Sequence, residues 1–61
     1  SESDRMFIFL ESTQKQFTRK DYLNYFKEIS SATASRDLKF AVDKNLIAKI
    51  GDKKTTIYNK N

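Results

Sequence analysis

The side chains best suited to contact another molecule lie between residues 31 and 39, where small hydroxyl groups precede basic ones. If this segment is helical, the 100° step per residue places Arg36 and Lys39 outward, with Thr33 and Ser35 flanking them. An Arg guanidinium can donate two hydrogen bonds to guanine, at O6 and N7. Hydroxyls such as that of Ser31 can contact bases or phosphates near the start of a helix. The pattern is typical of a helix that binds duplex DNA, and a merely solvated basic face is the simpler alternative.

Further basic residues extend this hypothesis to neighbouring segments. Arg19 and Lys20 lie near the expected start of a second helix, and Lys49, Lys53 and Lys54 lie on or beside an expected turn. Lysines on such a turn are also ordinary for solubility. As phosphate contacts, they would supply affinity without sequence information and steepen its salt dependence by about 0.9 each on a log–log scale. The predicted nucleic-acid contacts are Arg19, Lys20, Ser31, Thr33, Ser35, Arg36, Lys39, Lys49, Lys53 and Lys54.

Three apolar residues support an alternative partner. Phe7 and Ile8 widen the apolar surface of the first expected helix, either as extra core or as a seam against a parent-chain domain or a second copy. Phe40 is expected to be exposed beside Asp43, where its ring can stack on Arg36 or anchor a protein. Because Asp43 repels phosphate, a protein-interaction module that binds no nucleic acid stays open.

Catalysis, metals and cofactors find little support in the composition. The sequence has no Cys and no His, which removes disulfides, thiolate chemistry, the usual zinc ligands and histidine-based catalytic pairs. Asp37 and Asp43 lie six residues apart on the expected third helix, so they turn away from a shared acid–base site. We expect no enzymatic activity, no metal and no cofactor.

Length and charge indicate one small domain with an anionic partner. The 61 residues carry a net charge of +4, yet residues 1–14 hold three acidic side chains against one basic, whereas residues 15–61 hold eleven basic against five acidic. The longest apolar run, Met6 to Leu10, is far short of the roughly 20 residues that cross a bilayer, so no membrane contact and a cytoplasmic location are expected. The absence of an initiator Met suggests an excised C-terminal fragment of a larger protein.

Apolar spacing and capping signals predict the first two helices. Ser3 or Asp4 caps the first, whose stripe continues through residues 6, 9, 10 and 13. After an extended joint at residues 17–18, Thr18 and Asp21 have the spacing of a capping box. The second helix is expected to run from Arg19 to about residue 28, with its apolar stripe at residues 22, 25, 26 and 29.

A third helix and a β-hairpin are predicted to follow. Ser30 or Ser31 caps the helix, residues 34, 38, 41 and 42 form its buried stripe, and Asn45 ends it in the left-handed conformation. Strands at 46–50 and 55–58 then flank a turn at 51–54. Alternation places Leu46, Ala48 and Ile50 against the helices and Lys49 on the other face. The expected fold class is α+β, mainly α: a winged helix-turn-helix of three helices followed by a two-stranded hairpin.

A family resemblance points the same way. Residues 17–23 and 29–38 resemble a signature of bacterial winged helix-turn-helix modules, read here as Ser30-x-x-Thr33-Ala34-x-Arg36-Asp37-Leu38. It is shared by transcriptional repressors of the DeoR type and by the C-terminal winged-helix domain of Fic-family proteins, which residues 46–58 also resemble. The chain stops soon after the hairpin, which favours the Fic-type module. Fic proteins commonly transfer AMP through a motif with a His and a Gly-Asn-Gly-Arg turn; this sequence lacks it, so no transferase activity is expected of the piece.

Overall fold

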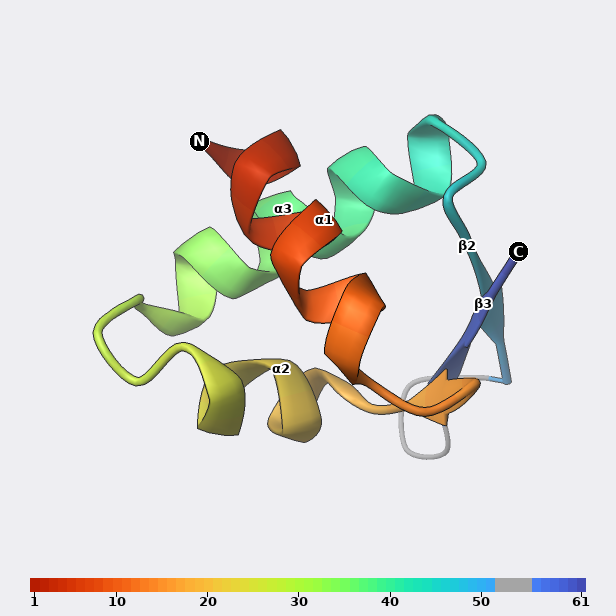
Figure 1. Cartoon of the computed structure of the whole chain (residues 1–61), viewed down its shortest axis with the longest axis horizontal. Helices are drawn as coiled ribbons and strands as arrows, with labels where there is room; N and C mark the ends of the chain where they lie inside the picture. The colour runs from red at the N-terminus through yellow and green to blue at the C-terminus, as the bar shows by residue number, and fades with distance from the viewer. Residues whose placement is uncertain (52–55) are drawn as a thin grey trace.

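The computed structural model describes residues 1–51 and 56–61, and these residues form three helices and three short strands (Figure 1). Their order is α1 (Glu2–Ser12), β1 (Gln16–Phe17), α2 (Arg19–Tyr25), α3 (Ser31–Asp43), β2 (Ile47–Ile50) and β3 (Ile57–Lys60). The α+β class and the three helices are confirmed. Most of the predicted turn, including Lys53 and Lys54, lies outside the described residues.

The sheet has a strand that the sequence analysis missed. Its order is β1-β3-β2 and both pairings are antiparallel, so the predicted two-stranded hairpin is wrong in strand number. Gln16 lies opposite Asn59, and Phe17 opposite Tyr58. A strand of two residues is too short to show an alternation of apolar and polar residues. Its pairing partner β3 lies some forty residues further along the chain, so the local sequence predicted only an extended joint.

The helix caps follow the predicted chemistry with one shift. Ser1, not Ser3 or Asp4, caps α1, because its Oγ accepts from the Asp4 N–H and the helix begins earlier than expected. The capping box is confirmed: Thr18 Oγ1 accepts from the Asp21 N–H at 3.2 Å, and Asp21 Oδ2 accepts from the Thr18 N–H at 2.8 Å. These local bonds fix where the first two helices begin.

The third helix begins and ends as expected, whereas the second ends early. Ser30 Oγ caps α3 by accepting from the Thr33 N–H at 3.1 Å, and Asn45 takes a positive φ of 60° just after the helix. Helix α2 ends at Tyr25 instead of near residue 28. Residues 26–30 form the connection to α3, in which Phe26 and Ile29 leave the helix and pack against the core.

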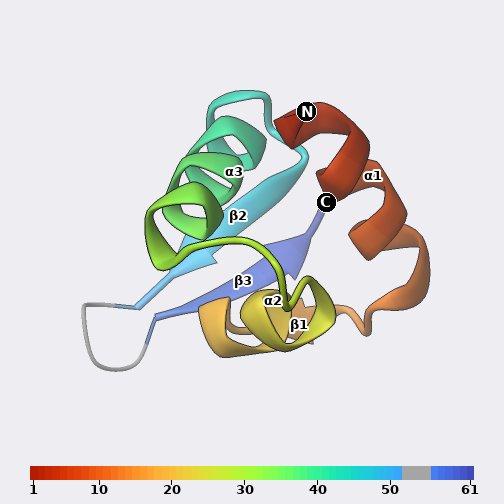
Figure 2. The ribbon, with the colours of Figure 1, turned by 90° about the vertical axis from the view of Figure 1, so that its left-hand side faces the viewer.

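The core joins all three helices to the sheet. The ring of Phe9 packs edge-on against Phe17 and Tyr22, each with centroids 4.9 Å away. Figure 2 shows α3 lying alongside β2. The buried apolar residues are Met6, Phe9, Phe17, Tyr22, Ala34, Leu38, Ala41, Ile47 and Tyr58. Within the described ranges, no helix has the length and hydrophobicity needed to cross a membrane.

The predicted face of β2 is wrong by one residue. Ile47 is 1% exposed, whereas Ile50 is 42% exposed. The Leu46 N–H donates to the Ala41 carbonyl at 2.9 Å, so Leu46 closes the turn after α3 and the alternation of the strand begins at Ile47. Lys49 consequently shares the face of Ile47 and lies on the helix side of the sheet.

Candidate nucleic-acid interface

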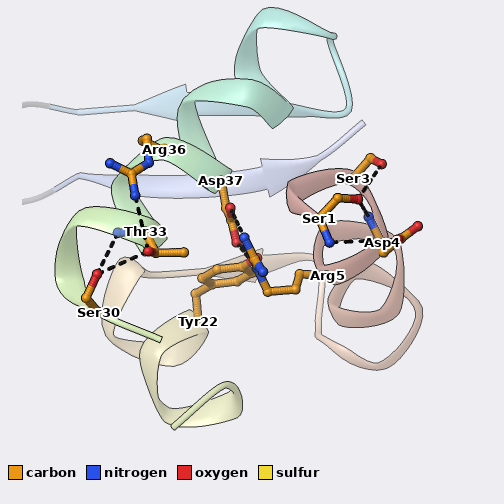
Figure 3. Close-up of polar contacts among 9 residues, drawn as sticks. All are labelled: Ser1, Ser3, Asp4, Arg5, Tyr22, Ser30, Thr33, Arg36 and Asp37. Atoms are coloured by element: carbon orange, nitrogen blue, oxygen red, sulfur yellow. Dashed lines mark hydrogen bonds and ion pairs between the residues drawn. The ribbon is translucent and has the colours of Figure 1, made fainter. Parts of the chain in front are cut away.

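Helix α3 is held by a buried carboxylate at its centre. Asp37 is 0% exposed, and its Oδ2 and Oδ1 accept from Arg5 Nε at 2.6 Å and Arg5 Nη2 at 2.9 Å. The Tyr22 hydroxyl donates to the same Oδ2 at 2.6 Å. Since Arg5 lies on α1 and Tyr22 on α2, this triad ties all three helices together (Figure 3). It fixes the rotation of α3, and with it the residues that α3 turns outward.

The protonation states of the triad follow from these contacts. Burial opposes ionisation of Asp37, but the hydrogen bonds from Arg5 and Tyr22 outweigh it and hold the pKa of Asp37 below its ordinary value. Burial, reinforced by the hydrogen bond to Asp37, raises the pKa of Tyr22. The hydrogen bond to Asp37 also raises the pKa of Arg5. Asp37 is therefore ionised in the core, and the positive charge of Arg5 balances its charge. It consequently does not repel an anionic ligand of α3.

The outward face of α3 is largely the predicted one. Ser31, Ala32, Ser35, Arg36 and Lys39 are exposed. Arg36 Nη2 donates to Thr33 Oγ1 at 3.4 Å, which directs its guanidinium toward the first turn of the helix (Figure 3). The basic and hydroxyl side chains of this face are open to solvent, as contact with a duplex requires.

Phe40 is not the exposed anchor that the sequence analysis expected. It is only partly exposed, because it follows Asp37 by three residues and so borders the side of α3 that packs on α1. Phe7 and Ile8, in contrast, are 54% and 51% exposed on α1. Of the three apolar residues predicted to contact a partner, Phe7 and Ile8 are thus the two that the structure exposes, and Tyr25 and Ile50 are exposed as well.

Arg19 links α2 to the start of α3. Its Nε donates to Ser35 Oγ at 3.3 Å, and its Nη2 donates to the Ser31 carbonyl at 3.2 Å and to Ser31 Oγ. Arg19, Ser31 and Ser35, all predicted to contact DNA, are therefore hydrogen-bonded to one another in the absence of DNA. Sequence reasoning had no signal for this contact, because sixteen residues separate Arg19 from Ser35.

A groove of about 840 Å³ runs between α3, the start of α2 and the sheet. Leu38, Val42 and Tyr58 give it an apolar side, and its polar rim holds four cations and one carboxylate. The residues that line it are Thr18, Arg19, Lys20, Ser35, Leu38, Lys39, Val42, Asp43, Lys49, Thr56 and Tyr58. The fold thereby brings five of the predicted contacts together: Arg19, Lys20, Ser35, Lys39 and Lys49.

Two electrostatic features shape the groove. Burial raises the pKa of Tyr58, and the nearby charge of Arg19 opposes that rise, so Tyr58 is a neutral phenol at the groove wall. Lys39 Nζ lies 3.2 Å from Asp43 Oδ2, with side chains 76% and 59% exposed. A pair this exposed contributes little energy, so phosphate can compete for Lys39. The rim keeps a net positive charge.

The remaining predicted contacts lie outside the groove. Ser31, Thr33 and Arg36 are not among its lining residues, and they extend the surface along the first turns of α3. Lys53 and Lys54 fall outside the described residues. Among residues 1–51 and 56–61, no group of three or more acidic, Cys or His side chains is placed to hold a metal ion.

Comparison of the chain with protein-family models, with curated proteins and with solved structures finds no match. The resemblance to Fic-type and DeoR-type modules therefore stays a prediction, and the function has to be argued from the surface itself.

Proposed function

We propose that the chain is a winged helix-turn-helix domain that binds duplex DNA with α3 in the major groove. The element order supports this assignment. Helices α2 and α3, joined by residues 26–30, correspond to the helix-turn-helix pair, and the strands β2 and β3 that follow correspond to the wing. In such pairs the second helix enters the major groove.

The observation that carries the proposal is the continuity between the outward face of α3 and the basic groove beside it. Lys20, Lys39 and Lys49 approach the groove from α2, α3 and β2 respectively. A DNA strand that passes over the groove would meet cations from three elements while α3 faces the bases. Phosphate contacts of this kind position a protein on the duplex and supply most of its nonspecific affinity.

The shape of α3 also suits the major groove. The helix has 13 residues, and its exposed first turns carry the small side chains Ser31, Ala32 and Ser35. A helix is about 10–12 Å across with its side chains, and the major groove is about 12 Å wide. Small residues on the leading face allow close approach, and Arg36 then reaches base edges from the second turn.

Fluorescence anisotropy at several salt concentrations tests the phosphate contacts. Replacing one phosphate-binding lysine should lower the log–log salt slope of duplex binding by about 0.9. We expect this for Lys49→Met. Lys15→Met is the matched control, because it removes the same charge from a residue that does not line the groove. Equal salt slopes for the two variants would contradict the proposed path of the DNA strand.

The exposure of Phe7 and Ile8 favours a second candidate function, contact with a protein. These residues would then pack on a parent-chain domain, on a second copy or on another protein, without nucleic acid. Ser substitutions at Phe7 and Ile8 separate the two functions, because they leave α3 and the groove intact. Unchanged duplex binding by this variant supports the DNA proposal. The alternative is supported if neither wild type nor the variant binds duplex, and if wild type associates with a protein partner but the variant does not.

A further inference from the structure

We infer that Arg19 is a positioning residue that turns Ser31 and Ser35 into hydrogen-bond donors, so that α3 selects duplex sites rich in guanine acceptors. The inference rests on the proposed role of α3 as the groove-reading helix. It adds a specificity and the residue that sets it.

The geometry places one guanidinium across two serines. Ser31 and Ser35 are four residues apart, so they lie one turn above the other on the same side of α3. Arg19 comes from the first turn of α2 and donates to both hydroxyl oxygens, through Nη2 and Nε respectively. The planar guanidinium of Arg19, which lines the groove, therefore holds both serine hydroxyl oxygens in place by hydrogen bonds.

A hydroxyl that accepts from a guanidinium keeps its own hydrogen for another partner. A Ser hydroxyl has one hydrogen to donate and two lone pairs, whereas the guanidinium carries only donors. In a helix the usual competitor for the Ser35 hydrogen is the carbonyl four residues back, which is that of Ser31. That carbonyl also accepts from Arg19 Nη2, at 3.2 Å. The arrangement thus weakens the internal alternative and polarises both O–H groups toward an external acceptor.

Arg36 adds further donors to the same part of α3. One of its N–H groups donates to Thr33 Oγ1, and that oxygen also interacts with Ser30 Oγ at 3.1 Å. A guanidinium has five N–H groups, so four remain for an external partner. The exposed first turns of α3 therefore present donors from Ser31, Ser35 and Arg36. The acceptor carboxylate of Asp43 lies at the opposite end of the helix, beside Lys39.

A surface that presents mainly donors discriminates among base pairs in the major groove. Guanine shows two neighbouring acceptors there, N7 and O6, whereas adenine pairs its N7 with an amino donor and cytosine shows an amino donor. Thymine offers one acceptor beside a methyl group. Guanine is thus the base that the first turns of α3 fit best, and the ligand class is a duplex whose central major groove carries guanine.

Selection from a pool of duplexes with a random central segment tests the inference, followed by binding to the selected site with guanine or with 7-deazaguanine. The second duplex keeps charge and pairing but loses N7. We expect enrichment of guanine and a roughly tenfold preference for the guanine duplex. Arg19→Lys keeps the charge without the fork, and Ser35→Ala removes one donor; both should lose most of the preference. Lys20→Met should weaken binding to both duplexes equally.

Three outcomes separate the claims. If wild-type protein binds duplexes but neither enriches guanine nor distinguishes 7-deazaguanine, the specificity is wrong and the proposed function stands. If Arg19→Lys and Ser35→Ala keep the full preference, Arg19 does not set it. If no duplex binds at any salt concentration, both the function and the specificity fail. Circular dichroism checks that each variant folds, which we expect because Arg19 and Ser35 are exposed.

Discussion

Removal of the Tyr22 hydroxyl tests how the core holds α3. Tyr22→Phe keeps the buried ring, which packs against Phe9, but deletes the donor to Asp37 Oδ2. A hydrogen bond to a charged group contributes about 1.5–3 kcal/mol. A domain of this length has a free energy of unfolding of roughly 3–9 kcal/mol, so the loss is a large part of the total. Arg5 still donates twice to Asp37, and we therefore expect a folded but weakened protein.

The pH dependence gives a second, independent signature. The pKa of Asp37 is depressed, so its stabilisation is present above about pH 4 and is lost as the pH falls through the folded-state value. The pKa of Tyr22 is raised, so its stabilisation is present below about pH 10 and is lost as the pH rises. Tyr22→Phe should reduce the loss of folding stability at alkaline pH. The loss that remains should come from Tyr58, because burial raises the pKa of that residue as well.

Urea unfolding followed by circular dichroism across this pH range measures both effects. Tyr25→Phe is the matched control, because it deletes the same atom from a side chain that is 47% exposed. A Tyr22→Phe variant within about 0.5 kcal/mol of wild type at neutral pH would refute the reasoning, since only ordinary surface substitutions have effects that small. An alkaline loss as steep as that of wild type would refute the assignment of that loss to Tyr22.

Three further substitutions test the packing. Leu38→Ala should lower the free energy of unfolding by roughly 2–5 kcal/mol in urea titrations, since Leu38 is 2% exposed; unchanged stability would remove it from the core. Ile47→Ala should cost clearly more than Ile50→Ala in the same assay, and the reverse order would restore the face of β2 that the sequence predicted. Lys60→Met should cost about 1 kcal/mol in thermal melts, because Lys60 Nζ donates to two carbonyls at the end of α1, each at 2.9 Å; an unchanged melting temperature would make that contact irrelevant.

The parts of the fold that the sequence predicted are those encoded within a few residues. The Thr18 capping box, the Ser30 cap and the left-handed Asn45 each depend on neighbours within one turn, and the structure has all three. The short strand β1 was missed because its pairing with β3 is non-local. The face of β2 was wrong because Leu46 closes the turn after α3 and the alternation of the strand begins at Ile47.

The candidate site divides in the same way. The exposure of Arg36 and Lys39 follows from helical periodicity and is present in the structure. The burial of Asp37 was not predictable, because its partner Arg5 lies 32 residues away and an Asp on a helix is ordinarily solvated. The contact of Arg19 with α3 likewise depends on how α2 and α3 pack. Sequence periodicity identifies which side chains face outward, but packing decides which of them meet.

The most direct test of DNA binding by α3 is the affinity for duplex DNA of the variant with both Arg36→Ala and Lys39→Ala. Lys15→Ala with Lys27→Ala removes the same charge from residues outside α3 and its groove. We expect wild type and the control pair to bind duplex with an affinity that falls steeply with salt, and the Arg36 and Lys39 variant to bind at least tenfold more weakly. Equal affinity and equal salt slope for the two double variants would show that α3 is not the DNA-binding element.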